Sequence, residues 1–179
     1  CSPEFLKSFY EVKGDLQLGV MTDYKRYNAN DFPNKSNDFI DFVRIACHPD
    51  KIAESLKVAE DLHKKGYKIF IQLMEIQNVG ADGYIELFQW KNKNILESLY
   101  FADIYSALKP EDIEKYYNKL KTIGYEKLSF HAHNELGLAL ENSLRAAELG
   151  CYTIDTTFNG IGRGGGNLKL QELLENLPC

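Results

Sequence analysis

Short apolar runs alternate with longer stretches of helical spacing along the chain, at a pitch of about 30 residues. This alternation predicts parallel strands joined by right-handed crossover helices, which is an α/β fold. The expected strands lie within residues 16–21, 39–46, 67–74, 96–104, 128–133 and 151–158. The expected helices lie within residues 2–12, 51–65, 84–93, 110–121, 137–149 and 168–177. A complete (β/α)8 barrel needs about 250 residues. With 179 residues, six strands fit an open doubly wound sheet or six-eighths of a barrel.

The composition is that of a globular protein, with 44% hydrophobic and 26% charged residues. A net charge of -5 without a basic run argues against nucleic acid or an anionic membrane as a partner. No stretch approaches the roughly 20 apolar residues of a transmembrane helix, and none resembles a signal peptide. The cysteines at positions 1, 47, 151 and 179 form no Cys-X-X-Cys pair. We therefore expect reduced cysteines in a cytoplasmic protein.

The fifth expected strand carries a His-X-His pair, His131 and His133. Residues two apart on a strand point to the same face, so the two imidazoles are expected to project together. Two neutral imidazoles side by side are natural metal ligands. Two strand histidines that hydrogen-bond to their neighbours are the alternative, and the residues downstream favour the metal site.

Polar residues gather at the carboxyl ends of the expected strands, where parallel α/β folds carry their functional groups. They are Arg44, His48, Gln72, Glu75, Asp103, His131, His133, Asn134, Asp155, Thr157 and Asn159. Arg44 stands within an apolar run and needs either a ligand anion or a structural ion pair with a strand-end acid. Asp103 fits a partner of a ligating histidine. It fits equally well a helix N-cap or a partner for Arg44.

The loop at residues 159–167 contains five glycines among nine residues, which lets the backbone approach a ligand closely. Backbone N–H groups ahead of the last helix are suited to hold an anion. Gly160, Gly162 and Gly165 also satisfy the G-x-G-x-x-G pattern of dinucleotide-binding proteins. That pattern usually lies in the first βαβ unit of its domain, so it is a weak indication here.

Four motifs together suggest a family: residues 131–139 (HAHNELGLA), Asp155-Thr156-Thr157, Gly160-Ile161-Gly162 and Gly166-Asn167. Over residues 128–168 the chain resembles the metal-dependent aldolase and acyl-condensing TIM-barrel superfamily. That superfamily contains 4-hydroxy-2-oxovalerate aldolase, 3-hydroxy-3-methylglutaryl-CoA lyase and isopropylmalate synthase. Over residues 40–127 the resemblance is weaker but collinear, and residues 43–48 (VRIACH) look most like the hydroxy-oxovalerate aldolase branch.

The resemblance implies an incomplete (β/α)8 TIM barrel with about six βα units, strands three to eight, as a single domain over residues 1–179. It implies a divalent metal, Mn²⁺ or Mg²⁺, held by His131, His133 and Asn167. The candidate catalytic residues are Arg44 and Asp103. The candidate substrate-binding residues are Gln72, Asn134, Thr157 and Gly162.

Several family features are absent from the sequence. The acidic third ligand and its neighbouring arginine, which the family carries on its first strand, are missing, and the glycine loop lacks the cysteine of the lyase branch. Because the chain begins at Cys1 rather than at methionine, we expect it to be part of a longer enzyme. Two histidines are too few to fix the metal and its enolate, so we expect the chain alone to be inactive or nearly so.

The implied activity is cleavage or formation of a C–C bond in a 4-hydroxy-2-oxo acid through a pyruvate-type enolate. A Claisen-type acyltransferase of the isopropylmalate or citramalate synthase kind is one alternative, and it would require acetyl-CoA. A non-catalytic fragment that needs an assembly partner is another, because an incomplete barrel leaves open strand edges. The expected partner is a small 2-oxo acid, and a homo-oligomer is left open.

Overall fold

A curved, five-stranded parallel sheet forms the centre of the computed structural model, which describes residues 3–37 and 39–177. The strands pair in the order in which they occur in the chain. They are β1 (Gly19–Asp23), β2 (Phe42–Cys47), β3 (Lys68–Leu73), β4 (Leu96–Asp103) and β5 (Leu128–Ala132). Ser2, which opens the first expected helix, and the two terminal cysteines lie outside the described residues.

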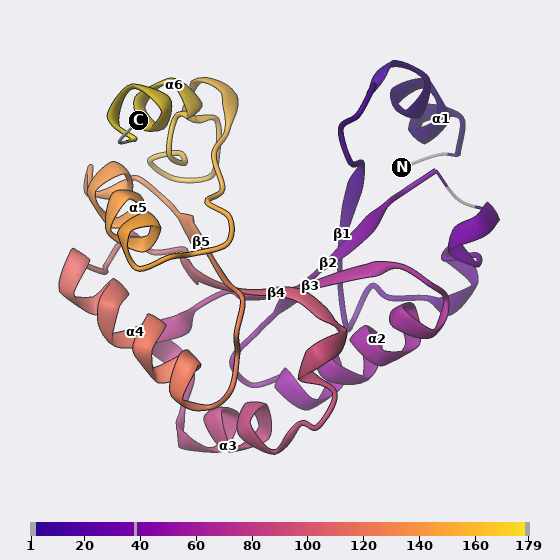
Figure 1. Cartoon of the computed structure of the whole chain (residues 1–179), viewed down its shortest axis with the longest axis horizontal. Coiled ribbons are helices and arrows are strands. Elements are labelled where there is room, and N and C mark those ends of the chain that lie inside the picture. The colour runs from indigo at the N-terminus through magenta and orange to yellow at the C-terminus, as the bar shows by residue number, and fades with distance from the viewer. Residues whose placement is uncertain (1–2, 38, 178–179) are drawn as a thin grey trace.

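Six α-helices are found in the described ranges, and α2 to α5 cover the convex side of the sheet (Figure 1). They are α1 (Pro3–Val12), α2 (Ile52–Lys64), α3 (Ala81–Gln89), α4 (Pro110–Thr122), α5 (Ala139–Glu148) and α6 (Leu170–Asn176). Within these described residues, no helix combines the length and the apolar character needed to cross a membrane.

The strand order decides between the two folds left open above. A doubly wound sheet reverses its strand order at a switch point and carries helices on both faces. Here the order is sequential and the crossover helices lie on one side, as in a barrel. The predicted fold class, part of a TIM barrel, is therefore confirmed.

Strand β2 shows how the sequence assigns the two faces of the sheet. Val43, Ile45 and Cys47 have no exposed surface and point toward the convex helices, while Arg44 points to the concave side. Helix α2 covers them with the predicted stripe, which is buried: Ile52, Leu56, Ala59 and Leu62. Burying each large aliphatic side chain contributes about 1.5–3 kcal/mol, so this convex layer stabilises the fold.

The expected sixth strand, residues 151–158, is not a regular strand. The segment still runs parallel to β5, because the Tyr152 N–H donates to the Leu128 carbonyl (2.6 Å) and the Asp155 N–H to the Phe130 carbonyl (3.0 Å). It has only isolated bridges to its neighbours. We call residues 151–157 the edge segment, since they extend the sheet beyond β5 without a full ladder.

Helix α3 begins and ends earlier than predicted, at Ala81 and Gln89 rather than within 84–93. Gly80 and Gly83 favour a turn ahead of residue 84, which is why the sequence predicts a later start for this helix. Gly80 is the N-cap, but Gly83 lies inside the helix, where a Cβ would stand 2.7 Å from the Ile52 Cδ1. Gly83 thus permits close packing of α3 on α2.

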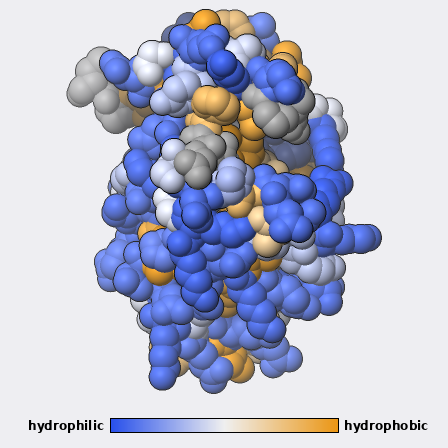
Figure 2. Space-filling view, turned by 90° about the vertical axis from the view of Figure 1, so that its right-hand side faces the viewer, coloured by the Kyte–Doolittle hydropathy of each residue, from blue (hydrophilic) through white to orange (hydrophobic). Residues whose placement is uncertain are grey.

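The side of the molecule that carries α1 is mostly hydrophilic, with apolar residues gathered toward its centre and top (Figure 2). Helix α1 contributes little to the core, because Phe5, Phe9 and Val12 are all exposed. The core instead lies between the convex face of the sheet and helices α2 to α5.

Candidate functional site

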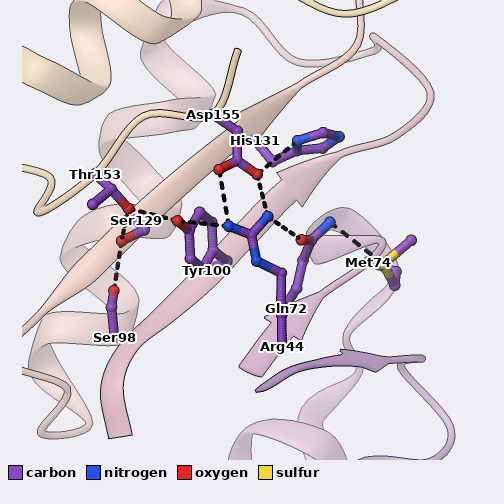
Figure 3. Close-up of polar contacts among 9 residues, drawn as sticks. All are labelled: Arg44, Gln72, Met74, Ser98, Tyr100, Ser129, His131, Thr153 and Asp155. Atoms are coloured by element: carbon purple, nitrogen blue, oxygen red, sulfur yellow. Dashed lines mark hydrogen bonds and ion pairs between the residues drawn. The ribbon is translucent and has the colours of Figure 1, made fainter. Parts of the chain in front are cut away.

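A polar network occupies the concave face of the sheet (Figure 3). Side chains alternate between the two faces of a strand, and this periodicity directs one polar residue of each of several strands inward. Arg44 comes from β2, Gln72 from β3, Tyr100 from β4 and His131 from β5, and Asp155 comes from the edge segment. Hydrogen bonds connect these five side chains into one network.

An ion pair between Arg44 and Asp155 forms the centre of the network. The Arg44 Nη1 and Nη2 donate to the Asp155 Oδ2 (2.5 Å) and Oδ1 (3.0 Å), and less than a fifth of either side chain is exposed. Four strand spacings of about 4.8 Å separate β2 from the edge segment, so a flat sheet would hold them about 19 Å apart. The contact therefore requires the strong curvature of a barrel wall.

The Arg44 guanidinium donates two further hydrogen bonds. Nη1 donates to the Gln72 Oε1 (3.3 Å) and Nη2 to the Tyr100 hydroxyl (2.9 Å), and the guanidinium carbon lies 4.1 Å from the Tyr100 ring centre. The Tyr100 hydroxyl continues to Thr153 (2.6 Å), and Thr153 donates to Ser129 (2.8 Å). The charged pair is thus embedded in hydrogen-bonded neighbours on every side.

His131 is joined to this network through Asp155. Its Nδ1 lies 3.0 Å from the Asp155 Oδ2, the oxygen that also accepts from Arg44. Burial by itself raises the pKa of Asp155, but the hydrogen bond from His131 and the charge of Arg44 outweigh it and leave that pKa below its usual range. Asp155 is therefore a carboxylate acceptor at neutral pH.

His133 follows β5 directly, on the same side as His131, with ring centres 5.3 Å apart. Its Nδ1 is buried without a hydrogen-bond partner, because the nearest carboxylate oxygen, Glu135 Oε1, lies at 3.6 Å. Burial, followed by the charge of His131, lowers the pKa of His133. The neutral imidazole, which is the form that binds metals, is thus favoured.

The glycine loop packs against the residues that follow β5. The Asn134 N–H donates to the Gly166 carbonyl (2.9 Å), and His133 pairs with Asn167 in an isolated antiparallel bridge. A Cβ at Gly165 would lie 2.5 Å from the Glu135 Cα. Only glycine permits this approach, so the loop composition places Asn167 beside His133.

The carboxamide of Asn167 has a constrained place in this loop. Its Nδ2 donates to the Ile161 carbonyl (3.3 Å), while its Oδ1 is buried without a partner. A Cβ at Gly162 would stand 2.7 Å from the Asn167 amide atoms, so glycine is needed there to accommodate the side chain. An unpartnered buried oxygen is costly unless a ligand satisfies it.

Two candidate residues have their side chains engaged elsewhere. Asp103 is fully buried and accepts from the N–H groups of Ala107 (2.9 Å) and Leu108 (3.0 Å) in the loop before α4. It is not the helix N-cap stated as an alternative above, because the N-cap of α4 is Lys109. The Asn134 Oδ1 accepts from the Ala139 N–H (3.1 Å) at the start of α5. Burial raises the pKa of Asp103, against the opposing effect of the two amides. A catalytic role for Asp103 and substrate binding by the Asn134 side chain stay predictions that these contacts do not favour.

Gln72 and Thr157, two candidate substrate-binding residues, differ in whether their side chains have a hydrogen-bond partner. Gln72 is buried and engaged by Arg44, whereas the Thr157 Oγ1 is buried without a partner. Sequence reasoning missed Tyr100, Thr153 and Glu135. Residues two apart on a strand point to the same face, so Tyr100 could have been placed on the concave side from Ala102, and Thr153 from Asp155.

The donors that this part of the molecule offers to a metal are few. Among the residues that the structure describes, no three His, Cys, Asp or Glu side chains gather as a metal site. The donors that fit are the two histidines and the Asn167 Oδ1, and the burial of that oxygen without a hydrogen-bond partner favours a ligand there. Imidazole nitrogens suit transition-metal cations, and a carbonyl oxygen suits harder cations, so this donor set fits a divalent metal without selecting one.

Comparison with known proteins now places this site in a family. The model of the HMGL-like family matches residues 47–178, which is most of the chain. The chain belongs to the HMGL-like family. Two curated relatives of this HMGL-like chain are 28% identical to it. They are oxaloacetate decarboxylase of Mycobacterium tuberculosis, over 97% of this chain, and 4-hydroxy-2-oxovalerate aldolase of Carboxydothermus hydrogenoformans, over 96%. The match covers 52% and 51% of those proteins, so the chain spans about half of their length.

Solved structures show the same fold. The N-terminal domain of a protein named as an aldolase from Bacteroides vulgatus superposes with a TM-score of 0.85 at 24% identity, over 97% of this chain and 59% of that one. The carboxyl transferase domain of Rhizobium etli pyruvate carboxylase gives 0.75 at 18% identity, over 96% and 32%. The HMGL-like relatives of this chain include aldolases and synthases, so the chain falls within an enzymatic superfamily.

Proposed function

We propose that this HMGL-like chain carries the metal-binding part of an aldolase that breaks or forms a C–C bond in a 4-hydroxy-2-oxo acid. The observation that carries the proposal is the pair of adjacent histidines on the concave face. A buried Asn167 oxygen without a partner, on a residue whose backbone pairs with His133, supports it. The names of two relatives, a hydroxy-oxovalerate aldolase and an oxaloacetate decarboxylase, support a 2-oxo acid as the substrate.

The proposed cofactor is Mn²⁺ or Mg²⁺, held by His131, His133 and Asn167. When bound, such a cation supplies Lewis-acid polarisation of a substrate carbonyl. Three donors are fewer than the six that these ions usually take. Water, substrate oxygens and an acidic ligand from outside the described residues are proposed to complete the set.

The chain's own residues are proposed to bind and orient the substrate. The Thr157 hydroxyl is buried without a partner, and we assign it a hydrogen bond to a carboxylate oxygen of the 2-oxo acid. Gln72 and Gly162 are proposed to act indirectly. Gln72 accepts a hydrogen bond from Arg44, and Gly162 leaves room for the Asn167 amide. The hydrogen bonds of Arg44 to Asp155 and Tyr100 favour a role in organising the site over direct contact with substrate.

A Claisen-type acyltransferase is the second candidate. It is favoured by a 2-isopropylmalate synthase of Pseudoalteromonas atlantica that is 44% identical over 61 residues. An acyltransferase would consume acetyl-CoA and release a free thiol, whereas an aldolase would release pyruvate without CoA. The two reactions are thus separated by their products.

The test measures pyruvate release from 4-hydroxy-2-oxovalerate and from oxaloacetate, coupled to lactate dehydrogenase, and thiol release from acetyl-CoA with a 2-oxo acid. It uses the longest reading frame that encodes this chain, with Mn²⁺ or Mg²⁺ and with a chelator. We expect metal-dependent pyruvate release that falls at least 100-fold in His131→Ala and His133→Ala, while residues 1–179 alone stay nearly inactive. Activity that survives chelation and both substitutions would contradict the proposal.

A further inference from the structure

Both histidines of the site turn the same ring nitrogen toward a carboxylate. The His131 Nδ1 lies 3.0 Å from the Asp155 Oδ2, and the His133 Nδ1 lies 3.6 Å from the Glu135 Oε1. In the described part of the chain, no hydrogen bond or ion pair engages either Nε2 atom. The two carboxylates come from different segments, so the shared arrangement is not a consequence of one local turn.

A carboxylate only accepts hydrogen bonds, so the His131 Nδ1, which lies within hydrogen-bond distance of Asp155, must carry the proton of the neutral ring. The His133 Nδ1 lies beyond hydrogen-bond distance of Glu135, but the negative charge 3.6 Å away favours a proton on that nitrogen too. The proton of each ring is therefore expected on Nδ1. The other nitrogen, Nε2, then has a free lone pair, which is what a metal ligand needs.

We propose that Asp155 and Glu135 are positioning residues that hold His131 and His133 as their Nδ1–H tautomers and present both Nε2 atoms to a divalent cation. This inference rests on the proposed function, because it assigns these two residues a role toward the metal site proposed above. In this arrangement the Arg44–Asp155 ion pair orients His131, and neither residue is assigned a contact with the reacting atoms.

Arg44 fixes the direction of the Asp155 carboxylate. Two contacts from the guanidinium to the two carboxylate oxygens leave little freedom to rotate, so Oδ2 is held toward His131. Glu135 is held differently. Its carboxylate lies against Gly164, where a Cβ would stand 2.0 Å from the Oε1, so the side chain occupies space that only glycine leaves open.

The experiment is long-range ¹H–¹⁵N NMR of the histidine rings in the metal-free protein. It is recorded at a pH about two units above the ordinary histidine pKa, so that the rings are neutral. The ¹⁵N shifts of the two ring nitrogens report the tautomer directly. The variants are Asp155→Asn and Glu135→Ala, with Tyr100→Phe as the matched control, because it changes the same network without removing a carboxylate. A second measurement titrates Mn²⁺ into each protein and follows affinity by calorimetry.

We expect both rings of the wild type to be Nδ1–H. Asp155→Asn moves His131 alone toward Nε2–H, since the single amide oxygen is drawn to Arg44 and the NH₂ group faces the ring. Glu135→Ala moves His133 alone, Tyr100→Phe moves neither, and the two carboxylate variants weaken Mn²⁺ binding about 10- to 100-fold. A wild-type Nε2–H tautomer at either ring overturns the inference, without need of a variant that folds. Failure of the proposed metal site is a separate result: Mn²⁺ would then leave both histidine signals unbroadened while the tautomers stay as expected.

Discussion

The ion pair between Arg44 and Asp155 gives a sharp prediction about stability. Less than a fifth of each side chain is exposed, so removing one partner leaves a charge that is mostly buried. Breaking such a pair costs about 3–5 kcal/mol. In Arg44→Met, the Asp155 carboxylate loses two charge-assisted hydrogen bonds worth about 1.5–3 kcal/mol each, or about 3–6 kcal/mol together, which overlaps that range.

The assay is urea unfolding followed by circular dichroism. With a slope of about 2 kcal/mol per molar urea, the Arg44→Met midpoint is expected about 2 M below the wild type. Asp155→Leu is expected to behave similarly. The double variant is expected to lose only about 0–1 kcal/mol, because an apolar pair replaces both charges and leaves neither unpaired. The control is Arg145→Met, which removes a more exposed arginine bound to Glu114 (2.7 Å) and is expected to leave the midpoint nearly unchanged.

Two outcomes would refute this reasoning. One is a loss below about 1 kcal/mol in Arg44→Met, which is the value of an exposed surface pair. The other is a double variant whose loss equals the sum of the single losses, which would mean that the two side chains stabilise the fold independently.

Three further predictions concern neighbouring elements. Asp103→Ala leaves the buried Leu108 amide and the partly buried Ala107 amide without their acceptor. We expect a loss of about 2–4 kcal/mol in the same urea titration, whereas an unchanged midpoint would rule out the loop-capping role. Gly162→Ala places a Cβ 2.7 Å from the Asn167 amide, so Mn²⁺ affinity in calorimetry is expected to fall about tenfold with the circular dichroism spectrum unchanged; retained affinity would separate Asn167 from the metal site. The Leu18 N–H and a lysine lower the pKa of Asp41 against the opposing effect of burial, so its contribution is present above the unfolded pKa of about 3.9 and is lost as pH falls through the folded value. The difference in unfolding free energy between wild type and Asp41→Asn should therefore begin to narrow below about pH 4 and close once the pH lies below the folded pKa. A difference that stays constant throughout acidification would contradict the assignment.

The direction of the strand residues was predictable from the sequence only where apolar and polar residues alternate. In β2 the alternation places Arg44 opposite Val43 and Ile45, and the structure confirms this. In β4 the last residues are buried on both faces, so no alternation shows which way Asp103 points. It shares the convex side with Leu99 and Phe101, opposite to the face that carries Tyr100, and this explains why its carboxylate caps a loop.

Long-range pairing was predictable in kind but not in detail. Arg44 was expected to meet a ligand anion or a strand-end acid, yet its partner lies 111 residues away in a segment that forms no regular strand. No local pattern selects Asp155 over the other acids at strand ends. The curvature of the sheet makes that choice, and curvature arises from all the strand pairings together.

Curvature and site chemistry therefore depend on the same contacts. The Arg44–Asp155 pair joins β2 to the edge segment across a distance that would be about 19 Å in a flat sheet. Asp155 in turn holds the His131 ring by the same oxygen that accepts from Arg44. Any change that lets the sheet open must break this pair and release His131 together. The incomplete barrel is thus expected to lose the arrangement of its candidate metal ligands before it loses its convex hydrophobic layer, which packs on the opposite face and involves none of these residues.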